Sequence, residues 1–192
     1  MKTIHIFILF IVVAVAQLFV PAQMIFNRES IINKGIAYKF KTQPVDPSDP
    51  YRGKYINLNY EQNSFVTSDT MWERKDKVYV CLETDSLGFA KVNAVSKTPL
   101  NLDKDFFIAE VVWYNKKDQK LNFNLPFNRY YMEETKAYDA EVAVRNNRRD
   151  SVTNTTYALV YIKDGEAVLN DVVINDISIK EYVEKDIDKS ID

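Results

Sequence analysis

The chain is poor in the residues that most often build catalytic and metal sites. Its 192 residues include one histidine, one cysteine and four glycines. The only cysteine, Cys81, excludes an internal disulfide, and its place in a strand-like segment predicts a buried, unreactive thiol. The only histidine, His5, lies in an apolar N-terminal segment, which excludes Ser-His-Asp and Cys-His catalysis in the rest of the chain. Without a His/Cys cluster or a glycine-rich run, neither a zinc site nor a phosphate-binding loop is expected.

The charged residues do not indicate a cofactor or a nucleic-acid ligand. The formal net charge is −2, so no nucleic-acid partner is predicted. The carboxylate pairs Asp46/Asp49 and Glu133/Glu134 could hold a hard cation such as Ca²⁺, but adjacent carboxylates are typical of a solvated surface. We therefore predict no metal and no cofactor. Hydrolase activity that uses two carboxylates or a Ser-Lys pair remains an alternative function, because the spacing in the sequence does not show which side chains face each other.

A long apolar segment opens the chain. Only three residues between positions 4 and 26 are polar, and about 20 apolar residues span a bilayer core. Residues 1–26 are therefore predicted to form a transmembrane anchor, and residues 27–35 a helical stalk with Gly35 as its C-cap. The alternative is a signal peptide cleaved after Ala16, at an A-x-A sequence. We favour the anchor because the apolar residues continue well past that sequence. The lysine at position 2 favours a cytoplasmic N-terminus.

Residues 36–179 have the pattern of a β-rich domain. Apolar and polar residues alternate, as in half-buried strands, over residues 36–41, 55–61, 77–83, 89–96, 105–115, 120–128 and 156–174. Asp164-Gly165 predicts a type I′ turn within the last of these segments. A helical period predicts one short helix within residues 133–149, and residues 180–192 form a charged tail. The predicted fold is α+β, a mainly antiparallel β domain with one short helix, behind an N-terminal transmembrane helix.

The segment VDPSDPYRGKYINLNYE, residues 45–61, predicts a rigid turn that leads into a strand. Each of its two X-Pro steps favours an extended aspartate before the proline, and the glycine tolerates a positive φ before the strand. The segment resembles the central motif of the GDYXXLXY family through Asp46, Pro47, Asp49, Pro50, Arg52, Gly53, Tyr55, Leu58 and Tyr60. It departs from the motif at Lys54, where the family has an aspartate. That reversal of charge argues that the position is structural or peripheral.

A second block, FNRYYMEE at residues 127–134, resembles the family's segment of arginine, tyrosine, aromatic residue and glutamate. It contributes Arg129, Tyr130, Tyr131 and Glu134. The order of the anchor, the two blocks, the short helix and the closing hairpin also fits, so the resemblance covers most of the chain. It implies a bacterial, membrane-anchored protein whose relatives are often encoded beside multi-spanning membrane proteins. It implies no mechanism.

Both blocks combine arginine with tyrosine, two residues that are enriched at protein interfaces. We expect the two blocks to form one patch in the fold. The candidate contact residues are Asp46, Asp49, Arg52, Gly53, Tyr55, Leu58, Tyr60, Arg129, Tyr130, Tyr131 and Glu134. The predicted function is a non-enzymatic binding or accessory module, held in the bacterial inner membrane by one helix, with its C-terminal domain extracytoplasmic. Its predicted partners are the lipid bilayer and a multi-spanning membrane protein. The alternatives are a membrane-surface hydrolase and a ligand- or sugar-sensing β-domain with an aromatic-lined cleft.

Overall fold

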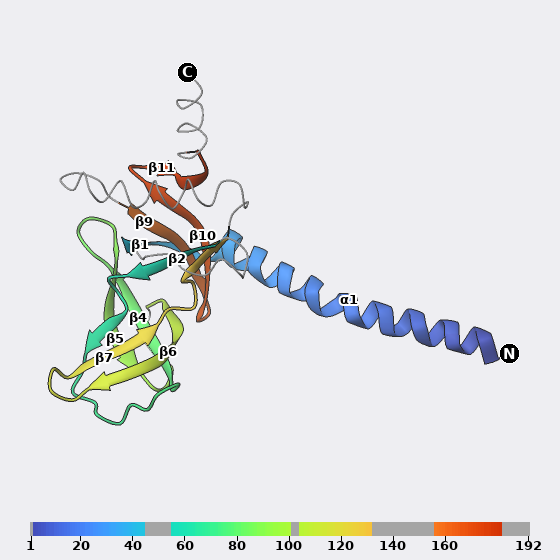
Figure 1. Ribbon diagram of the computed structural model, residues 1–192, viewed down its shortest axis with the longest axis horizontal. Helices are drawn as coiled ribbons and strands as arrows, with labels where there is room; N and C mark the ends of the chain where they lie inside the picture. Colours follow the sequence, from blue (N-terminus) through green and yellow to red (C-terminus); the bar gives the residue numbers. More distant parts are fainter. Residues whose placement is uncertain (1, 45–54, 101–103, 132–155, 182–192) are drawn as a thin grey trace, which may run out of the picture.

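A computed structural model describes residues 2–44, 55–100, 104–131 and 156–181 of the chain. One long helix, α1 (Lys2–Lys34), projects away from a β-domain, with the N-terminus at its far end (Figure 1). The strands of the domain are β1 (Ile36–Pro44), β2 (Tyr55–Tyr60), β3 (Ser64–Val66), β4 (Lys77–Thr84), β5 (Ala90–Ser96), β6 (Phe106–Asn115), β7 (Lys120–Asn124), β8 (Arg129–Tyr131), β9 (Thr156–Lys163), β10 (Glu166–Ile174) and β11 (Ile177–Ser178).

Helix α1 is long and apolar enough to cross a membrane. It has 33 residues, which corresponds to about 50 Å of helix, against about 30 Å for the hydrocarbon core of a bilayer. Its segment Thr3–Lys34 has a mean hydropathy of 2.6 in the most apolar window, and that window is not buried by the rest of the chain. By length and composition, α1 is therefore the one candidate membrane span among the described residues. The part of α1 that follows the apolar segment remains helical up to Lys34, where the helix reaches the domain.

The last turn of α1 joins the domain through close backbone packing. The amide of Gly35 donates to the carbonyl of Ile31 at 2.8 Å, and Ile31 is 95% buried, with only 5% of its surface exposed. Gly35 was predicted as a C-cap, and the helix does end at Lys34. However, Gly35 does not adopt the left-handed conformation of a glycine cap. It is required instead because a Cβ here would lie 2.9 Å from the carbonyl oxygen of Ile162 and closer still to that of Ile31.

Replacing Gly35 by alanine is therefore expected to destabilise the junction by about 1–3 kcal/mol, because two backbone carbonyls cannot yield as a flexible side chain would. Denaturant unfolding of the full chain in detergent measures the change. The matched control is Lys34→Ala, at the preceding exposed position, which should shift the free energy of unfolding by less than about 0.5 kcal/mol. Equal stability of both variants would show that the helix and the domain are not packed together in this way.

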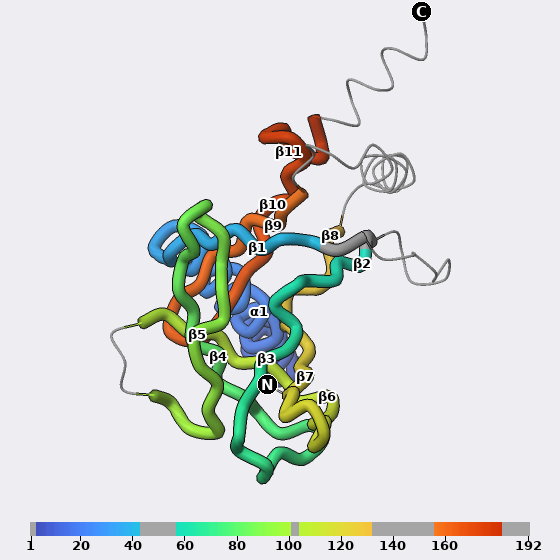
Figure 2. The backbone as a smooth tube through the Cα atoms, turned by 90° about the vertical axis from the view of Figure 1, so that its left-hand side faces the viewer, coloured from blue at the N-terminus to red at the C-terminus, as the bar shows by residue number. Residues whose placement is uncertain are grey.

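The strands form two antiparallel sheets. One has the order β11-β10-β9-β1-β2-β8, and the other has the order β3-β7-β6-β4-β5. The first half of β1 pairs with β9 and its end pairs with β2, so β1 connects the two halves of the first sheet. Isolated bridges, Lys39 with Phe89 and Phe107 with Gly165, bring the two sheets together. Figure 2 shows the resulting arrangement, with β2 and β8 side by side.

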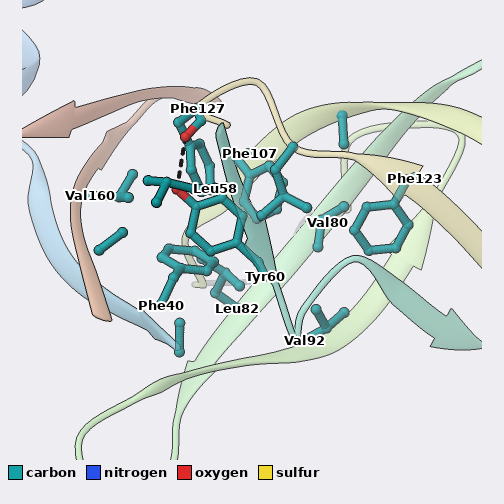
Figure 3. Close-up of a cluster of buried hydrophobic side chains, with 14 of the residues drawn as sticks. Phe40, Leu58, Tyr60, Val80, Leu82, Val92, Phe107, Phe123, Phe127 and Val160 are labelled. Atoms are coloured by element: carbon teal, nitrogen blue, oxygen red, sulfur yellow. Dashed lines mark hydrogen bonds between the residues drawn. The ribbon is translucent and has the colours of Figure 1, made fainter. Parts of the chain in front are cut away.

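The core lies between these sheets and is rich in aromatic residues. Phe40, Tyr60, Phe107 and Phe127 contact one another, with ring centroids between 4.9 and 6.1 Å apart (Figure 3). Such tilted and edge-to-face contacts add to the free energy gained from burying the rings. The four rings come from β1, β2, β6 and the segment before β8. The cluster therefore fixes strands of both sheets relative to one another.

The mainly antiparallel β fold behind an apolar helix confirms the predicted fold class. Asp164 and Gly165 have φ values of 51° and 85°, as the predicted type I′ turn requires. The prediction missed β3, β8 and β11, which have two or three residues each and are too short to show an alternating pattern. The helix predicted within residues 133–149 lies outside the described residues. A helical turn begins at Ile179, whose side chain is fully buried.

Candidate functional site

The part of the first block that the structure describes, strand β2, contributes its side chains to the core. Leu58 and Tyr60 are 5% and 1% exposed, and they lie on the same face of β2 because they are two residues apart. The hydroxyl of Tyr60 donates to the carbonyl of Phe127 at 2.8 Å. Burial raises the pKa of this hydroxyl, so it stays protonated and remains a donor. These two motif residues therefore hold the core together, and a partner would not reach their side chains.

The two sequence blocks meet in the fold as neighbouring strands. Strand β2 pairs with β8, with Tyr55 opposite Tyr131 and Asn57 opposite Arg129 in the backbone register. The amide of Leu58 also donates to the carbonyl of Asn128 at 2.8 Å. Residues 72 to 76 positions apart in the sequence thus pair at one end of the first sheet. Four of the candidate residues, Asp46, Asp49, Arg52 and Gly53, lie outside the described residues, as does Glu134.

Tyr130 connects β8 to β10, another strand of the first sheet. Its side chain is 5% exposed, and its hydroxyl donates to Oδ1 of Asp171 at 3.0 Å. The same oxygen accepts the amide of Val172 at 2.8 Å. Burial raises the pKa of Tyr130, and the Asp171 carboxylate raises it further. Since three strands separate β8 from β10 in the sheet order, this hydrogen bond requires the first sheet to curl.

Sequence reasoning missed Asp171. It follows a register shift in β10, between Leu169 and Asp171, which changes the direction of the side chains there. The only sequence signal was the polar pair Asn170-Asp171 in an otherwise apolar strand. A polar pair of this kind is also compatible with a strand that faces solvent, so the residue could be recognised only from its contact with Tyr130.

The surface of the β2–β8 end is formed by the residues between the buried ones. Asn57, Arg129 and Tyr131 are all exposed, and Tyr131 is 64% exposed. Arg129 and Tyr131 are two residues apart in β8, so they project from the same face of the strand. Among the candidates whose side chains the structure describes, these two are the exposed ones that a partner could contact. We call the surface of Asn57, Arg129 and Tyr131 the β8 surface.

The described residues contain little that resembles a catalytic centre. No three His, Cys, Asp or Glu side chains in the described ranges gather where they could share a metal ion. Cys81 is 1% exposed, which confirms its predicted burial. The same burial raises the pKa of its thiol, and the thiol therefore remains protonated and unreactive.

One serine-lysine hydrogen bond occurs at the end of α1, where Nζ of Lys163 donates to Oγ of Ser30 at 3.3 Å. Lys163 also lies 3.8 Å from the carboxylate of Asp164. The pair joins α1 to the end of β9, next to the Gly35 contact. We therefore interpret it as a tether between the helix and the domain.

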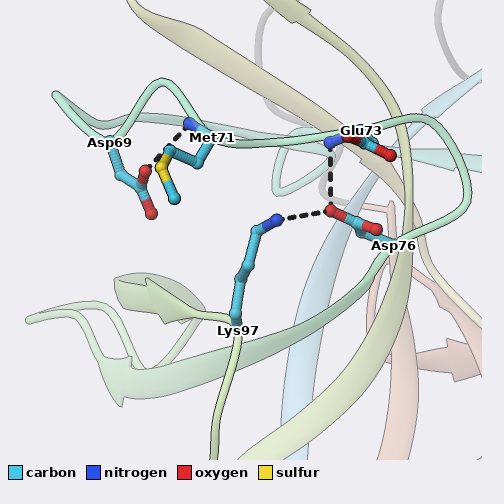
Figure 4. A network of polar contacts seen from close by, with 5 residues as sticks. All are labelled: Asp69, Met71, Glu73, Asp76 and Lys97. Atoms are coloured by element: carbon cyan, nitrogen blue, oxygen red, sulfur yellow. Dashed lines mark hydrogen bonds and ion pairs between the residues drawn. The ribbon is translucent and has the colours of Figure 1, made fainter.

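A polar network fixes the long loop between β3 and β4, which the sequence did not indicate. Nζ of Lys97 lies 2.7 Å from Oδ2 of Asp76, and the same oxygen accepts the amide of Glu73 at 3.0 Å (Figure 4). Lys97 also lies over the ring of Trp72, 5.4 Å from its centroid. The Lys97 hydrogen bond lowers the pKa of Asp76, and the Glu73 amide lowers it further. The network thus connects this loop to the end of β5.

Replacing Lys97 by methionine is expected to raise the pKa of Asp76 toward its ordinary value of 3.8, because the largest stabilising contact of the carboxylate is lost. Asp76 has a lowered pKa in the folded chain. It therefore contributes stability fully above its ordinary pKa and loses that contribution as the pH falls through the folded value. The Lys97→Met variant should show a weaker loss of stability in that acidic range. Carboxyl NMR titration measures the pKa directly.

The control for this titration is Lys91→Met, which removes a lysine 3.2 Å from Glu83 on the other strand of the same hairpin. This variant should leave the titration of Asp76 unchanged. An equal effect of both variants would mean that net charge, and not the Lys97 contact, sets the pKa of Asp76.

The comparisons with known proteins agree with the two sequence blocks. A family model described as GDYXXLXY protein matches residues 17–172, which cover most of the chain and both blocks. The comparisons with curated proteins and with solved structures found no match.

Proposed function

This chain belongs to the GDYXXLXY family, and we propose that it is a membrane-anchored, non-enzymatic module that binds a multi-spanning membrane protein through the β8 surface. In this proposal α1 crosses the bacterial inner membrane with its N-terminus in the cytoplasm, and the β-domain is extracytoplasmic. The observation that carries the proposal is the pairing of β2 with β8. It brings the two family blocks together, with their buried residues in the core and Arg129 and Tyr131 on the surface.

The exposed apolar surface of α1 supports an uncleaved anchor. Leu18, Phe19 and Phe26 follow the A-x-A sequence, and they are 70%, 66% and 73% exposed. Cleavage after Ala16 would leave these side chains in water, at a cost of about 25 cal/mol for each Å² of apolar surface. A bilayer covers them instead. The last turn of the helix packs on the domain, so the domain is held close to the membrane surface.

The composition of the β8 surface supports a protein partner. Arginine and tyrosine contribute large contact areas and several hydrogen bonds, and they are common among the residues that dominate binding energies. A partner with an apolar or acidic surface near the membrane would complement them. The surface holds no cluster of nucleophile and base, which is why we favour binding over catalysis at this position.

Photo-crosslinking from position 131 in native membranes tests the proposal. We expect a photoreactive residue in place of Tyr131 to capture one multi-spanning membrane protein. The yield should fall at least about tenfold when Arg129 is also replaced by alanine. Position 71, where Met71 is 74% exposed in the loop between β3 and β4, provides the control. Capture of the same protein from both positions, or of no membrane protein from position 131, would refute a specific contact at the β8 surface.

A further inference from the structure

A groove of about 210 Å³ next to the β8 surface has an unusual lining. Five asparagines and one tryptophan contribute to it, namely Asn59, Asn63, Trp113, Asn122, Asn124 and Asn128. The remaining lining residues are apolar or aromatic, and none of the lining residues is charged. The uncharged amides and the exposed indole that line the groove do not belong to the buried core. Packing of the core therefore does not explain why they gather here.

Strands β6 and β7 place one side of this lining. In β7 the buried residues Leu121 and Phe123 alternate with Asn122 and Asn124, which therefore share the outer face. In β6 a register shift between Val111 and Trp113 inserts one extra residue and sets Trp113 opposite Asn122. Bulges of this kind redirect side chains. Directly opposite residues lie on the same face, so the indole and the Asn122 amide are neighbours. Trp113 is 51% exposed.

Strand β2 and the turn after it place the other side. Asn59 lies between the buried Leu58 and Tyr60, so it points away from the core. Nδ2 of Asn63 donates to Oδ1 of Asn59 at 3.1 Å, and the carbonyl of Asn63 accepts the amide of Phe123 at 3.0 Å. These bonds fix the two amides against β7 before any ligand arrives. Asn128 also lines the groove, and its carbonyl accepts the amide of Leu58.

The chemistry of the lining selects the ligand class. An asparagine amide offers two donors and one acceptor oxygen without a charge, which matches hydroxyl groups that also donate and accept. A charged ligand would lose hydration here without gaining an ion pair. The indole of Trp113 offers a flat apolar face. A sugar ring has hydroxyls at its edge and apolar C–H groups on its face, so it complements both kinds of surface.

We propose that this groove binds a neutral carbohydrate, with the ring stacked on Trp113 and its hydroxyls hydrogen-bonded to the asparagine amides. Pockets of this kind combine an apolar wall with a few oriented polar groups. The site is separate from the β8 surface, since none of the residues Asn57, Arg129 and Tyr131 lines it.

Isothermal titration of the full chain tests this proposal, in a detergent without a sugar headgroup. The probes are N,N′-diacetylchitobiose and cellobiose as neutral disaccharides, a glucuronic-acid disaccharide as a charged one, and a neutral tripeptide. We expect saturable binding of at least one neutral disaccharide and a lower affinity for the other two probes. Trp113→Ala and Asn122→Ala should each weaken that binding about tenfold or more. NMR shifts of asparagine side-chain amides should report the same titration.

The matched control is Asn170→Ala, which removes an exposed asparagine of β10 outside the groove and outside the β8 surface. It should leave the affinity for the disaccharide unchanged. A folded protein that binds neither neutral disaccharide would overturn the proposal. Preference for the charged sugar or the tripeptide, or equal losses from Asn170→Ala and Asn122→Ala, would also overturn it. The crosslinking experiment tests positions 129 and 131, which do not line the groove. A failure of the partner-binding proposal can therefore be distinguished from a failure of the carbohydrate proposal.

Discussion

Replacing Tyr60 by alanine is expected to lower the free energy of unfolding of the domain by about 3–5 kcal/mol, which is the range for deleting a large buried aromatic side chain. Tyr60 is 1% exposed, and its ring contacts Phe40 and Phe127 at centroid distances of 5.8 and 5.3 Å. The substitution removes these contacts and leaves the Phe127 carbonyl without its 2.8 Å hydrogen bond. Denaturant unfolding of the full chain in detergent, followed by tryptophan fluorescence, measures the loss.

The variant Tyr60→Phe separates the contribution of the buried ring from that of the hydrogen bond to the Phe127 carbonyl. It keeps the ring in the core and removes only the donor, so the expected loss is about 1–3 kcal/mol, the cost of an unsatisfied buried acceptor. Tyr131→Phe is the matched control, because it removes a hydroxyl from a side chain that is 64% exposed. A Tyr60→Ala variant as stable as the wild type would contradict a structural role for the motif tyrosine. It would also restore the possibility that this residue contacts a partner.

Introducing arginine at both Val13 and Leu18 is expected to abolish membrane integration of the chain. Each arginine near the centre of a spanning helix costs about 2.5–3.5 kcal/mol, so the two together oppose insertion by about 5–7 kcal/mol. Leu18 is 70% exposed along the helix, and no other part of the described chain covers the apolar segment. Alkaline carbonate extraction of bacterial membranes measures the integrated fraction. The wild type should stay in the pellet, and the variant should not.

The control variant carries arginine at Asn27 and Asn33, beyond the apolar part of the same helix. It should remain integrated, because these positions lie outside the predicted hydrocarbon core. Mass spectrometry of the native N-terminus accompanies this experiment. An intact N-terminal segment supports the anchor. A mature protein that begins at Gln17 and is found in the soluble fraction would replace the anchor by a cleaved signal peptide.

Most of the strands could be predicted because their information is local. In β2, β7 and β9 the alternation of apolar and polar residues follows the two-residue period of a strand with one buried face. The Asp164-Gly165 turn is equally local, since few other dipeptides accept two consecutive positive φ values. The three missed strands, β3, β8 and β11, have no such period, and long-range pairing alone defines them. The helix boundary at Gly35 was predicted, but its reason, the approach of the Ile162 carbonyl, was not local.

The candidate site was less predictable than the fold. The sequence suggested that the two arginine-tyrosine blocks meet, and β2 does pair with β8 where both are described. It did not show that Leu58, Tyr60 and Tyr130 face inward, because either face of a strand can be the buried one. The polar pair that contains Asp171 and the asparagines of the groove did not indicate a site, since polar residues in strands are common on solvated faces.

The sequence by itself determined the apolar helix, the β-rich domain behind it, and the family to which both belong. These features could be predicted because each depends on a local pattern: a long apolar run, a two-residue alternation, or the residues of one turn. The tertiary structure alone decided which side chains of the motif are buried, which reach the β8 surface, and which line the groove. These properties depend on strand register, on the bulges in β6 and β10, and on the curl that brings Tyr130 to Asp171. All three arise from contacts between residues distant in the sequence, so no local pattern encodes them.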